Sequence, residues 1–240
     1  MAWNWIRQNR GFLLFMLLLG VFRTAVADWN PIPSGSMHPG LLEGDVVFVN
    51  RLAYNVKVPL TDVVLARTGE PVRGDIVTFS SPMDGRRLIK RIVALPGDTV
   101  QMTGRRLILN GQPVTYRFEG LAADAGDGSL EMTLQEALGS RAHEIQWASD
   151  RRVAADFGPI VIPPDHYLML GDNRDNSADS RFIGLVERKL LIGRAERILV
   201  SAAIRDNWRL RLSRFGAPPA CRSACTRSSR SAWRAGSAMA

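Results

Sequence analysis

The spacing of turns between short apolar runs is the feature that most constrains the fold of this 240-residue chain. The dipeptide Gly-Asp occurs five times, among them at 44–45, 74–75, 97–98 and 171–172, and the first three copies lead into strand-like runs at 46–50, 76–79 and 99–102. Asn110-Gly111, between runs at 106–109 and 112–114, is a strong hairpin signal. Short strands at this spacing predict a mainly β chain with an all-β sheet or barrel-like domain. The 46% hydrophobic content is enough to bury one substantial core.

The chain contains one apolar run of membrane grade, from Phe12 to Phe22. Arg7 and Arg10 precede it, which favours an N-terminus on the inner side of a membrane. Residues 11–27 would form a helix of about 25 Å, slightly short for a hydrocarbon core of about 30 Å. The segment 25–27, Ala-Val-Ala, also fits the cleavage pattern of a removed signal peptide. From spacing alone, a retained anchor and a removed signal peptide are equally open.

A loop rich in serine, glycine and proline, IPSGSMHPG at 32–40, follows the apolar run almost directly. Gly35 frees the backbone between Ser34 and Ser36, so that one hydroxyl can face a substrate while the other turns towards the same reacting atom. Taken alone, such a loop is more typical of a juxtamembrane linker. His38 suggests a Ser-His pair, but neighbours on a tight loop seldom point at each other, so we expect a solvated side chain there.

Lysine is scarce in this chain: Lys57, Lys90 and Lys189 are the only lysines among 31 basic residues. A buried lysine can lose its proton and act as a general base, which arginine cannot do. Lys57 and Lys189 have polar neighbours and are interpreted as solvated surface charges. Lys90 lies in the β-type run 88–95, where two-residue alternation places it on the same face as Leu88, Ile92 and Ala94. The alternative is an edge lysine whose amine reaches water.

The segment GDNRDNSADSRFIG at 171–184 follows an apolar strand-like run and is dense in side chains that hydrogen-bond their own backbone. A calcium loop beginning at Asp175 is excluded, because Ser180 stands where glycine is needed and Val186 where a bidentate glutamate is needed. The three histidines are far apart and lack ligand spacing. We therefore expect no metal and no cofactor.

Three of these segments together resemble the bacterial type I signal peptidases, membrane-anchored serine proteases that use a Ser/Lys dyad. PSGSMHPGLLEGD, RLIKRIVALPGD and GDNRDNSADSRFIG match the serine, lysine and C-terminal boxes of that family in order and spacing, and RLRLSRFG at 209–216 resembles its final strand. The resemblance covers residues 23–216, approximately. It implies a membrane-anchored all-β catalytic domain of signal-peptidase-like fold after one N-terminal transmembrane helix.

Carried over position by position, the resemblance implies roles for individual residues. Ser36 resembles the nucleophile and Lys90 the general base. Ser34 resembles the hydroxyl donor of the oxyanion hole, with the backbone N–H of Ser36 as the second donor. Ser177 resembles the residue that orients the lysine amine.

The remaining positions resemble supporting and substrate-binding residues. Asp179 and Arg181 resemble the salt bridge beneath the lysine. The shallow apolar pockets that accept small substrate residues would be formed by Ile32, Pro33, Met37 and Ile89.

The resemblance implies an endopeptidase that removes signal peptides from exported preproteins after small residues of A-x-A type. It divides the chain into a cytoplasmic N-terminus (1–10), a retained transmembrane anchor (11–27), a periplasmic β-rich peptidase domain (28–216) with a variable β-ribbon subdomain (about 103–160), and a basic tail (217–240) that we expect to be disordered. The expected location is the bacterial inner membrane, single-pass, with the catalytic domain outside. The expected partners are preproteins and the lipid bilayer.

Two segments are assigned no chemistry. The stretch 120–149 is polar and irregular, and 129–138 within it fits either a helix or an extended piece. The tail contains both cysteines, Cys221 and Cys225, which could pair with each other but could not staple the core.

The net charge of +8 suggests a nucleic-acid partner until it is divided along the chain. Seven of the 31 basic residues lie in residues 1–27 and 217–240, which contain no acidic residue, leaving 24 basic against 23 acidic residues between them. The middle is therefore nearly neutral, and no nucleic-acid motif is present, so we expect no nucleic-acid partner.

Two other classes of protein share features of this sequence. A self-cleaving repressor of the LexA type also uses serine and lysine on a related β fold, but it should begin with a helix-turn-helix domain rather than an apolar run. A non-catalytic, membrane-tethered binding protein would share the architecture without needing Ser36, Lys90 and Ser177 together.

Overall fold

The computed structural model describes residues 2–58, 61, 63–123, 130–149, 156–204 and 207–219. Strands dominate, and the chain is mainly β, as the turn spacing predicts. The largest sheet is antiparallel, with the order β1-β2-β16-β5-β6-β14-β15, and β17 pairs with β16. Its strands are β1 (Ala27–Pro31), β2 (Asp45–Asn50), β5 (Ile76–Ser80), β6 (Arg87–Ala94), β14 (His166–Leu170), β15 (Val186–Glu187), β16 (Leu191–Ala203) and β17 (Arg209–Leu210).

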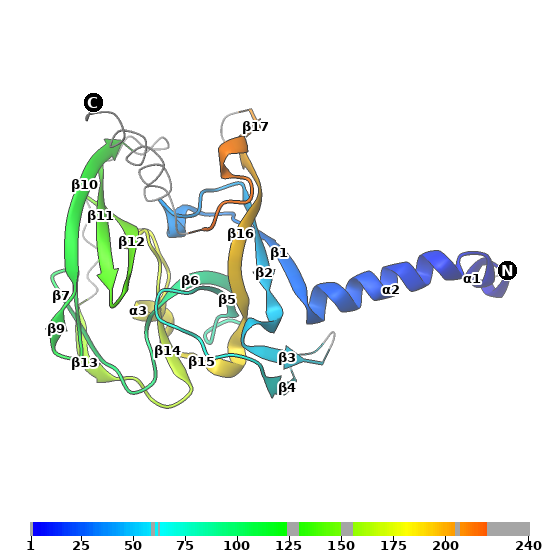
Figure 1. Ribbon diagram of the computed structural model, residues 1–240, viewed down its shortest axis with the longest axis horizontal. Coiled ribbons are helices and arrows are strands. Elements are labelled where there is room, and N and C mark those ends of the chain that lie inside the picture. The colour runs from blue at the N-terminus through cyan, green and yellow to red at the C-terminus, as the bar shows by residue number, and fades with distance from the viewer. Residues whose placement is uncertain are drawn as a thin grey trace, which may run out of the picture.

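Smaller sheets flank this one (Figure 1). One is made of β10 (Thr115–Ala123), β11 (Leu130–Leu138) and β12 (Arg141–Ala148). Another has the order β13-β7-β8-β9, from β7 (Thr99–Thr103), β8 (Arg106–Leu109), β9 (Gln112–Pro113) and β13 (Phe157–Val161), and β3 (Asn55–Lys57) pairs with β4 (Val64–Arg67). The short helical elements of the body are α3 (Ser180–Ile183) and the 3₁₀ turns Gly35–Met37, Arg51–Ala53, Arg188–Leu190 and Leu212–Arg214.

The turn signals are confirmed as strand boundaries. Strands β2, β5 and β7 begin within one or two residues of the Gly-Asp pairs, and Asn110-Gly111 turns β8 into β9. Asn110 and Gly111 both have positive φ (51° and 76°), the backbone that a tight hairpin of this kind requires. In β2, alternate residues are buried, which is the pattern of a strand with one face on a core.

The segment 120–149 was interpreted as irregular, but its described residues lie largely in the paired strands β10, β11 and β12. The extended alternative is therefore correct for 130–138, and residue 129 lies outside the described residues. The family-like segment at 209–216 is a strand only at β17 and continues as a 3₁₀ turn. The first residues of the predicted disordered tail pack on the domain, since Ala217 accepts a backbone hydrogen bond from Ile198. Cys221 and Cys225 lie outside the described residues.

The N-terminal helices α1 (Ala2–Gln8) and α2 (Arg10–Ala25) extend away from the sheets (Figure 1). Large apolar side chains of α2 are exposed, among them Phe12 (61%) and Leu17 (58%). Within the described part of the chain, no helix combines the length and the apolar character needed to cross a membrane.

The junction between α2 and the large sheet is held by Asp28 on β1. This carboxylate is 2% exposed and forms ion pairs with Arg23 at 3.0 Å, Arg87 at 2.8 Å and Arg51 at 3.7 Å. Arg23 lies on α2 and Arg87 on β6, and one residue separates α2 from β1. A buried carboxylate shared by three guanidiniums therefore fixes where the helix leaves the domain.

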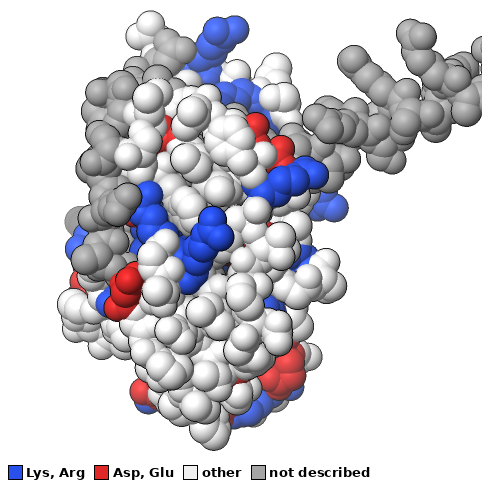
Figure 2. All heavy atoms as spheres, turned by 90° about the vertical axis from the view of Figure 1, so that its left-hand side faces the viewer, with Lys and Arg blue, Asp and Glu red and all other residues white. Residues whose placement is uncertain are grey.

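On the face of the molecule that Figure 2 presents, most of the described surface is neither acidic nor basic. The charged side chains form small separate groups rather than one continuous area. This agrees with the nearly neutral charge balance of the middle of the sequence.

Candidate active site

The serine loop is held by the core beneath it. The backbone of Ile32 exchanges hydrogen bonds with the β2 turn, donating to Asp45 O (2.8 Å) and accepting from Gly44 N (3.0 Å). Met37 and Leu41 are wholly buried, and Leu41 N donates to Met37 O at 3.0 Å. Ser36 lies on the same 3₁₀ turn as Met37 and immediately precedes it. The packing of Met37 in the core therefore fixes the position of Ser36.

Lys90 reaches Ser36 from β6. Its Nζ donates to Ser36 Oγ at 2.7 Å, and the two residues are 3% and 9% exposed. The edge-lysine alternative is therefore wrong, because the amine is buried. Burial lowers the pKa of Lys90 to about 8, against the weaker raising effect of the Asp179 and Asp172 carboxylates. At that pKa a useful fraction of the amine is neutral near physiological pH, and a neutral amine can accept a proton from a hydroxyl.

Ser34 lies beside this pair. Its hydroxyl is 3.5 Å from Ser36 Oγ, and the residue is exposed. His38 is half-buried rather than solvated, because its ring lies against Gly35; a Cβ added to Gly35 would come 3.2 Å from His38 Cε1.

The loop after β14 closes over the serine. Asn173 N donates to Ser36 O at 3.1 Å. A Cβ added to Gly171 would lie 2.2 Å from Ser177 Oγ and 2.6 Å from Ser36 O, so only glycine fits between these two serines. Ser177 is thus brought close to Ser36, and its buried hydroxyl has no hydrogen-bond partner among the described residues.

Asp179 and Arg181 form the ion pair that the sequence resemblance implies. Arg181 Nε donates to Asp179 Oδ1 at 2.7 Å, and Arg181 Nη2 to Asp179 Oδ2 at 2.8 Å. Asp179 Oδ2 also accepts from Gly171 N at 3.0 Å, and Arg181 Nη2 donates to Arg174 O at 2.6 Å. The pair therefore ties the two ends of the loop together.

Of the proposed pocket residues, Pro33 is exposed and Ile89 half-buried. Ile32 (2% exposed) and Met37 (0%) belong to the apolar core that packs beneath β2 and β16, and Ile89 packs against that core. The burial of Ile32 and Met37 leaves them little or no surface to offer a substrate, which the sequence pattern did not indicate.

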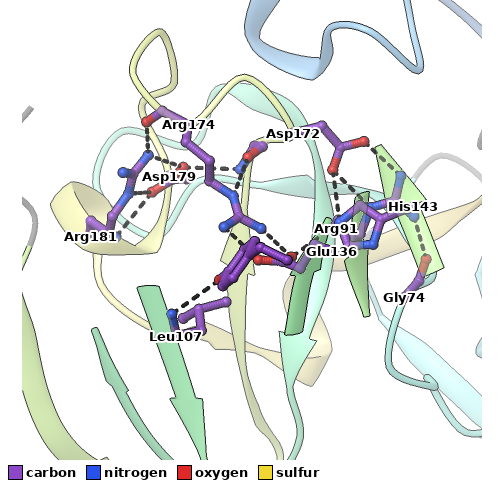
Figure 3. A network of polar contacts seen from close by, with 11 residues as sticks. Gly74, Arg91, Leu107, Glu136, His143, Asp172, Arg174, Asp179 and Arg181 are labelled. Carbon is purple, nitrogen blue, oxygen red and sulfur yellow. Dashed lines mark hydrogen bonds and ion pairs between the residues drawn. The ribbon is translucent and has the colours of Figure 1, made fainter. Parts of the chain in front are cut away.

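Sequence reasoning missed a second set of buried charged residues, which begins beside Lys90 (Figure 3). Arg91, which follows Lys90 on β6, binds Asp172 through two hydrogen bonds of 2.8 and 2.6 Å. Glu136 on β11 binds Arg174 in the loop, and His143 on β12 lies beside Glu136. The signal for Arg91 was present, since it follows Lys90 in the run 88–95, whose other residues are apolar. No local signal marked Glu136 or His143.

The predicted surface lysines have different outcomes. Lys189 is exposed, as expected, and it forms an ion pair with Glu187. Lys57 is buried, at 5% exposure, with its Nζ donating to Lys189 O at 3.2 Å, so its assignment as a solvated charge was wrong.

Comparison with known proteins supplies the family. The sequence model of "Signal peptidase, peptidase S26" matches residues 3–200. Signal peptidase I of Pseudomonas fluorescens is 36% identical over 208 residues, covering 82% of this chain and 72% of the relative. Signal peptidase I of Pseudomonas aeruginosa is 34% identical, with the same shares covered.

Among solved structures, a signal peptidase I from Enterococcus faecalis V583 is 26% identical and covers 52% of this chain and 96% of its own, with a TM-score of 0.32. The family match spans the serine loop, β6 and the loop after β14. The chain therefore belongs to the signal peptidase family of serine endopeptidases, peptidase S26.

Proposed function

We propose that this protein removes signal peptides from exported preproteins with Ser36 as nucleophile and Lys90 as general base. The observation that carries the proposal is the 2.7 Å contact between Lys90 Nζ and Ser36 Oγ in a buried site. A serine hydroxyl is a poor nucleophile until a neighbouring base takes its proton. Lys90 is that base, because burial lowers its pKa towards physiological pH.

The reaction divides into acylation and deacylation. Neutral Lys90 accepts the hydroxyl proton as Ser36 Oγ attacks the carbonyl carbon of the scissile bond. The resulting oxyanion accepts hydrogen bonds from the Ser36 N–H and the Ser34 hydroxyl. The ammonium of Lys90 then protonates the leaving amine as the C–N bond breaks. Lys90 next deprotonates a water molecule, which attacks the acyl ester, and its ammonium returns a proton to Ser36 Oγ.

The substrate residues before the cut are proposed to be small. Near Ser36, Pro33 and half-buried Ile89 offer an apolar surface, whereas Ile32 and Met37 are already packed into the core. A closed core beneath the surface leaves shallow depressions rather than deep pockets. Small side chains at the −1 and −3 positions fit such a surface, and large ones would have to displace the core.

A change at the −1 position of a preprotein is therefore expected to block cleavage. Replacing the −1 alanine with phenylalanine should abolish processing by the detergent-solubilised protein, while the same change at −2 should leave the rate within a few-fold. Gel analysis of precursor and mature forms measures both. Equal cleavage of the −1 alanine and phenylalanine precursors would contradict the proposed substrate preference.

The α2 helix is proposed to hold the protein in the bacterial inner membrane, with residues 1–10 inside and the catalytic domain outside. Its exposed apolar side chains support this, because an apolar face of this size is costly to leave in water. Trp3 and Trp5 on α1 suit the interface between lipid and water, and Arg7 and Arg10 favour an inside N-terminus.

Leu17→Arg is expected to move the protein from the membrane fraction to the soluble fraction, because a charge in the hydrocarbon region is costly. The matched control is Leu121→Arg on β10, which has the same 58% exposure but lies on the far sheet. Fractionation of cell membranes compares them, and intact mass of the wild type should show residues 1–27 attached. Membrane retention of the Leu17 variant, or a mature N-terminus at Asp28, would contradict the anchor.

A further inference from the structure

A buried ion pair links the β10–β11–β12 sheet to the loop that closes over Ser36 (Figure 3). Glu136 on β11 is 0% exposed, and Arg174 in the loop is 2% exposed. Arg174 Nη1 donates to Glu136 Oε1 at 2.8 Å, and Arg174 Nη2 binds Glu136 Oε2. Burial raises the pKa of Glu136, but the Arg174 guanidinium and the neighbouring His143 together outweigh burial and hold this pKa well below its usual range. The pair is therefore charged and bidentate at working pH.

The same sheet contacts the loop at its backbone. Gln146 N on β12 donates to Asp172 O at 2.8 Å, and Arg174 N donates to Gln146 O at 2.9 Å. His143, also on β12, lies with Nε2 3.2 Å from Glu136 Oε2 and 3.7 Å from Asp172 Oδ1. Asp172 in turn binds Arg91, the neighbour of Lys90 on β6. The loop is thus held between β12 and β6 at residues 172–174.

Arg174 is connected to Ser36 through few intermediate contacts. Arg174 Nε donates to Gly171 O at 3.1 Å, and Gly171 is the residue that separates Ser177 from Ser36. Two residues after Gly171, the backbone N–H of Asn173 donates to Ser36 O. A shift of the Arg174 side chain therefore displaces the loop segment that touches both serines.

We propose that Glu136 is a positioning residue for the Ser36–Lys90 pair: through Arg174 it sets the place of the 171–177 loop against Ser36 and Lys90. The inference rests on the proposed function of that pair. It gives the β10–β11–β12 sheet a role in catalysis, although the side chain of Glu136 does not touch the reacting atoms. Glu136 acts from a strand whose sequence suggested a polar, irregular segment.

Glu136→Gln is expected to lower kcat by an amount on the order of 10²-fold with little change in KM, because a displacement of about 1 Å at the reacting groups has that effect. Rates are expressed per folded molecule, from the folded fraction in a thermal melt, so that simple instability does not count. Glu119→Gln is the control: it makes the same change on β10, in an exposed ion pair with Arg117. It should leave kcat unchanged.

A second readout is independent of proteolysis. The chain has three lysines, so protein labelled with ¹³C at lysine Cε gives three lysine signals, assigned by single Lys→Arg variants. Glu136→Gln should shift the Lys90 signal and leave that of Lys189 in place. If Glu136→Gln does not fold, Glu136→Asp keeps the charge, withdraws the carboxylate by one methylene and should show both effects at smaller size.

The two readouts separate the possible failures. A wild type that does not process preproteins would overturn the proposed function, and the Lys90 signal would still decide whether Glu136 sets the site. An unchanged kcat in an otherwise active protein, or a lowered kcat with an unmoved Lys90 signal, would overturn the positioning role.

Discussion

Ser36→Ala is expected to abolish preprotein processing while the domain stays folded. The substitution removes the Oγ that lies 2.7 Å from Lys90 Nζ and leaves the buried core of the loop unchanged. Loss of the nucleophile in a serine protease costs on the order of 10⁶ in kcat. The measurement is conversion of a purified precursor by the detergent-solubilised variant, with circular dichroism to show that it is folded. Full residual processing would refute the assignment of the nucleophile.

Ser34→Ala provides the graded comparison. Its hydroxyl is one of two proposed donors to the oxyanion, and the backbone N–H of Ser36 remains when it is removed. The expected loss is on the order of 10² to 10³ in kcat, the effect of removing one such donor. Because Ser34 is exposed, stability should not change. A variant as inactive as Ser36→Ala, or as active as the wild type, would contradict this role.

Lys90→Arg is expected to be as inactive as Lys90→Met, because a guanidinium keeps its proton and cannot act as a base. In the wild type, kcat/KM should rise with pH and reach half its maximum near the Lys90 pKa of about 8. The pH–rate profile of the wild type and the residual activity of both variants measure these effects. An active arginine variant, or a profile flat between pH 6 and 10, would end the general-base assignment.

The same lowered pKa has a stability consequence with a definite sign. In the unfolded chain Lys90 has its ordinary pKa of 10.5, and in the folded protein burial lowers it to about 8. Between these values the unfolded state binds more protons, so stability rises with pH through that window and is lowest below it. At about 1.4 kcal/mol per pKa unit, the cost below pH 8 is about 3 kcal/mol.

Lys90→Met should therefore be inactive yet more stable than the wild type at pH 7, with a higher Tm, and the difference should shrink as pH rises towards 10. This is the pattern of a site that keeps a costly group for function. Thermal melts at both pH values test it, and a methionine variant less stable at pH 7 would contradict the burial cost.

Much of the fold and the contact between Ser36 and Lys90 was predictable because their signals are local. Strands such as β2 and β8 are bounded by turn residues whose backbone preferences act within two or three positions. Lys90 was identified because it interrupts an apolar strand in a chain that otherwise uses arginine. In these cases a short segment carries the information by itself, whatever it packs against.

The rest depends on packing between segments distant in sequence. Glu136 lies in a segment that the sequence describes only as polar and irregular, and its buried partner, Arg174, comes from 38 residues further along the chain. Lys57 likewise was expected in water, and its burial depends on the carbonyl of Lys189. Ile32 and Met37 were expected to face a substrate, but the apolar strands that enclose them cannot be placed from the loop alone.

The carboxylate of Asp28 joins two parts of the molecule that are usually considered separately. It binds Arg23 at the end of α2 and Arg87 at the start of β6, the strand that carries Lys90, and a single residue connects α2 to β1. The position of α2 is therefore fixed relative to the strand that carries Lys90. If α2 lies in a bilayer, these ion pairs of Asp28 set the distance of Ser36 from the lipid surface. Which peptide bond of an emerging precursor is cut would then depend on geometry as much as on side-chain recognition.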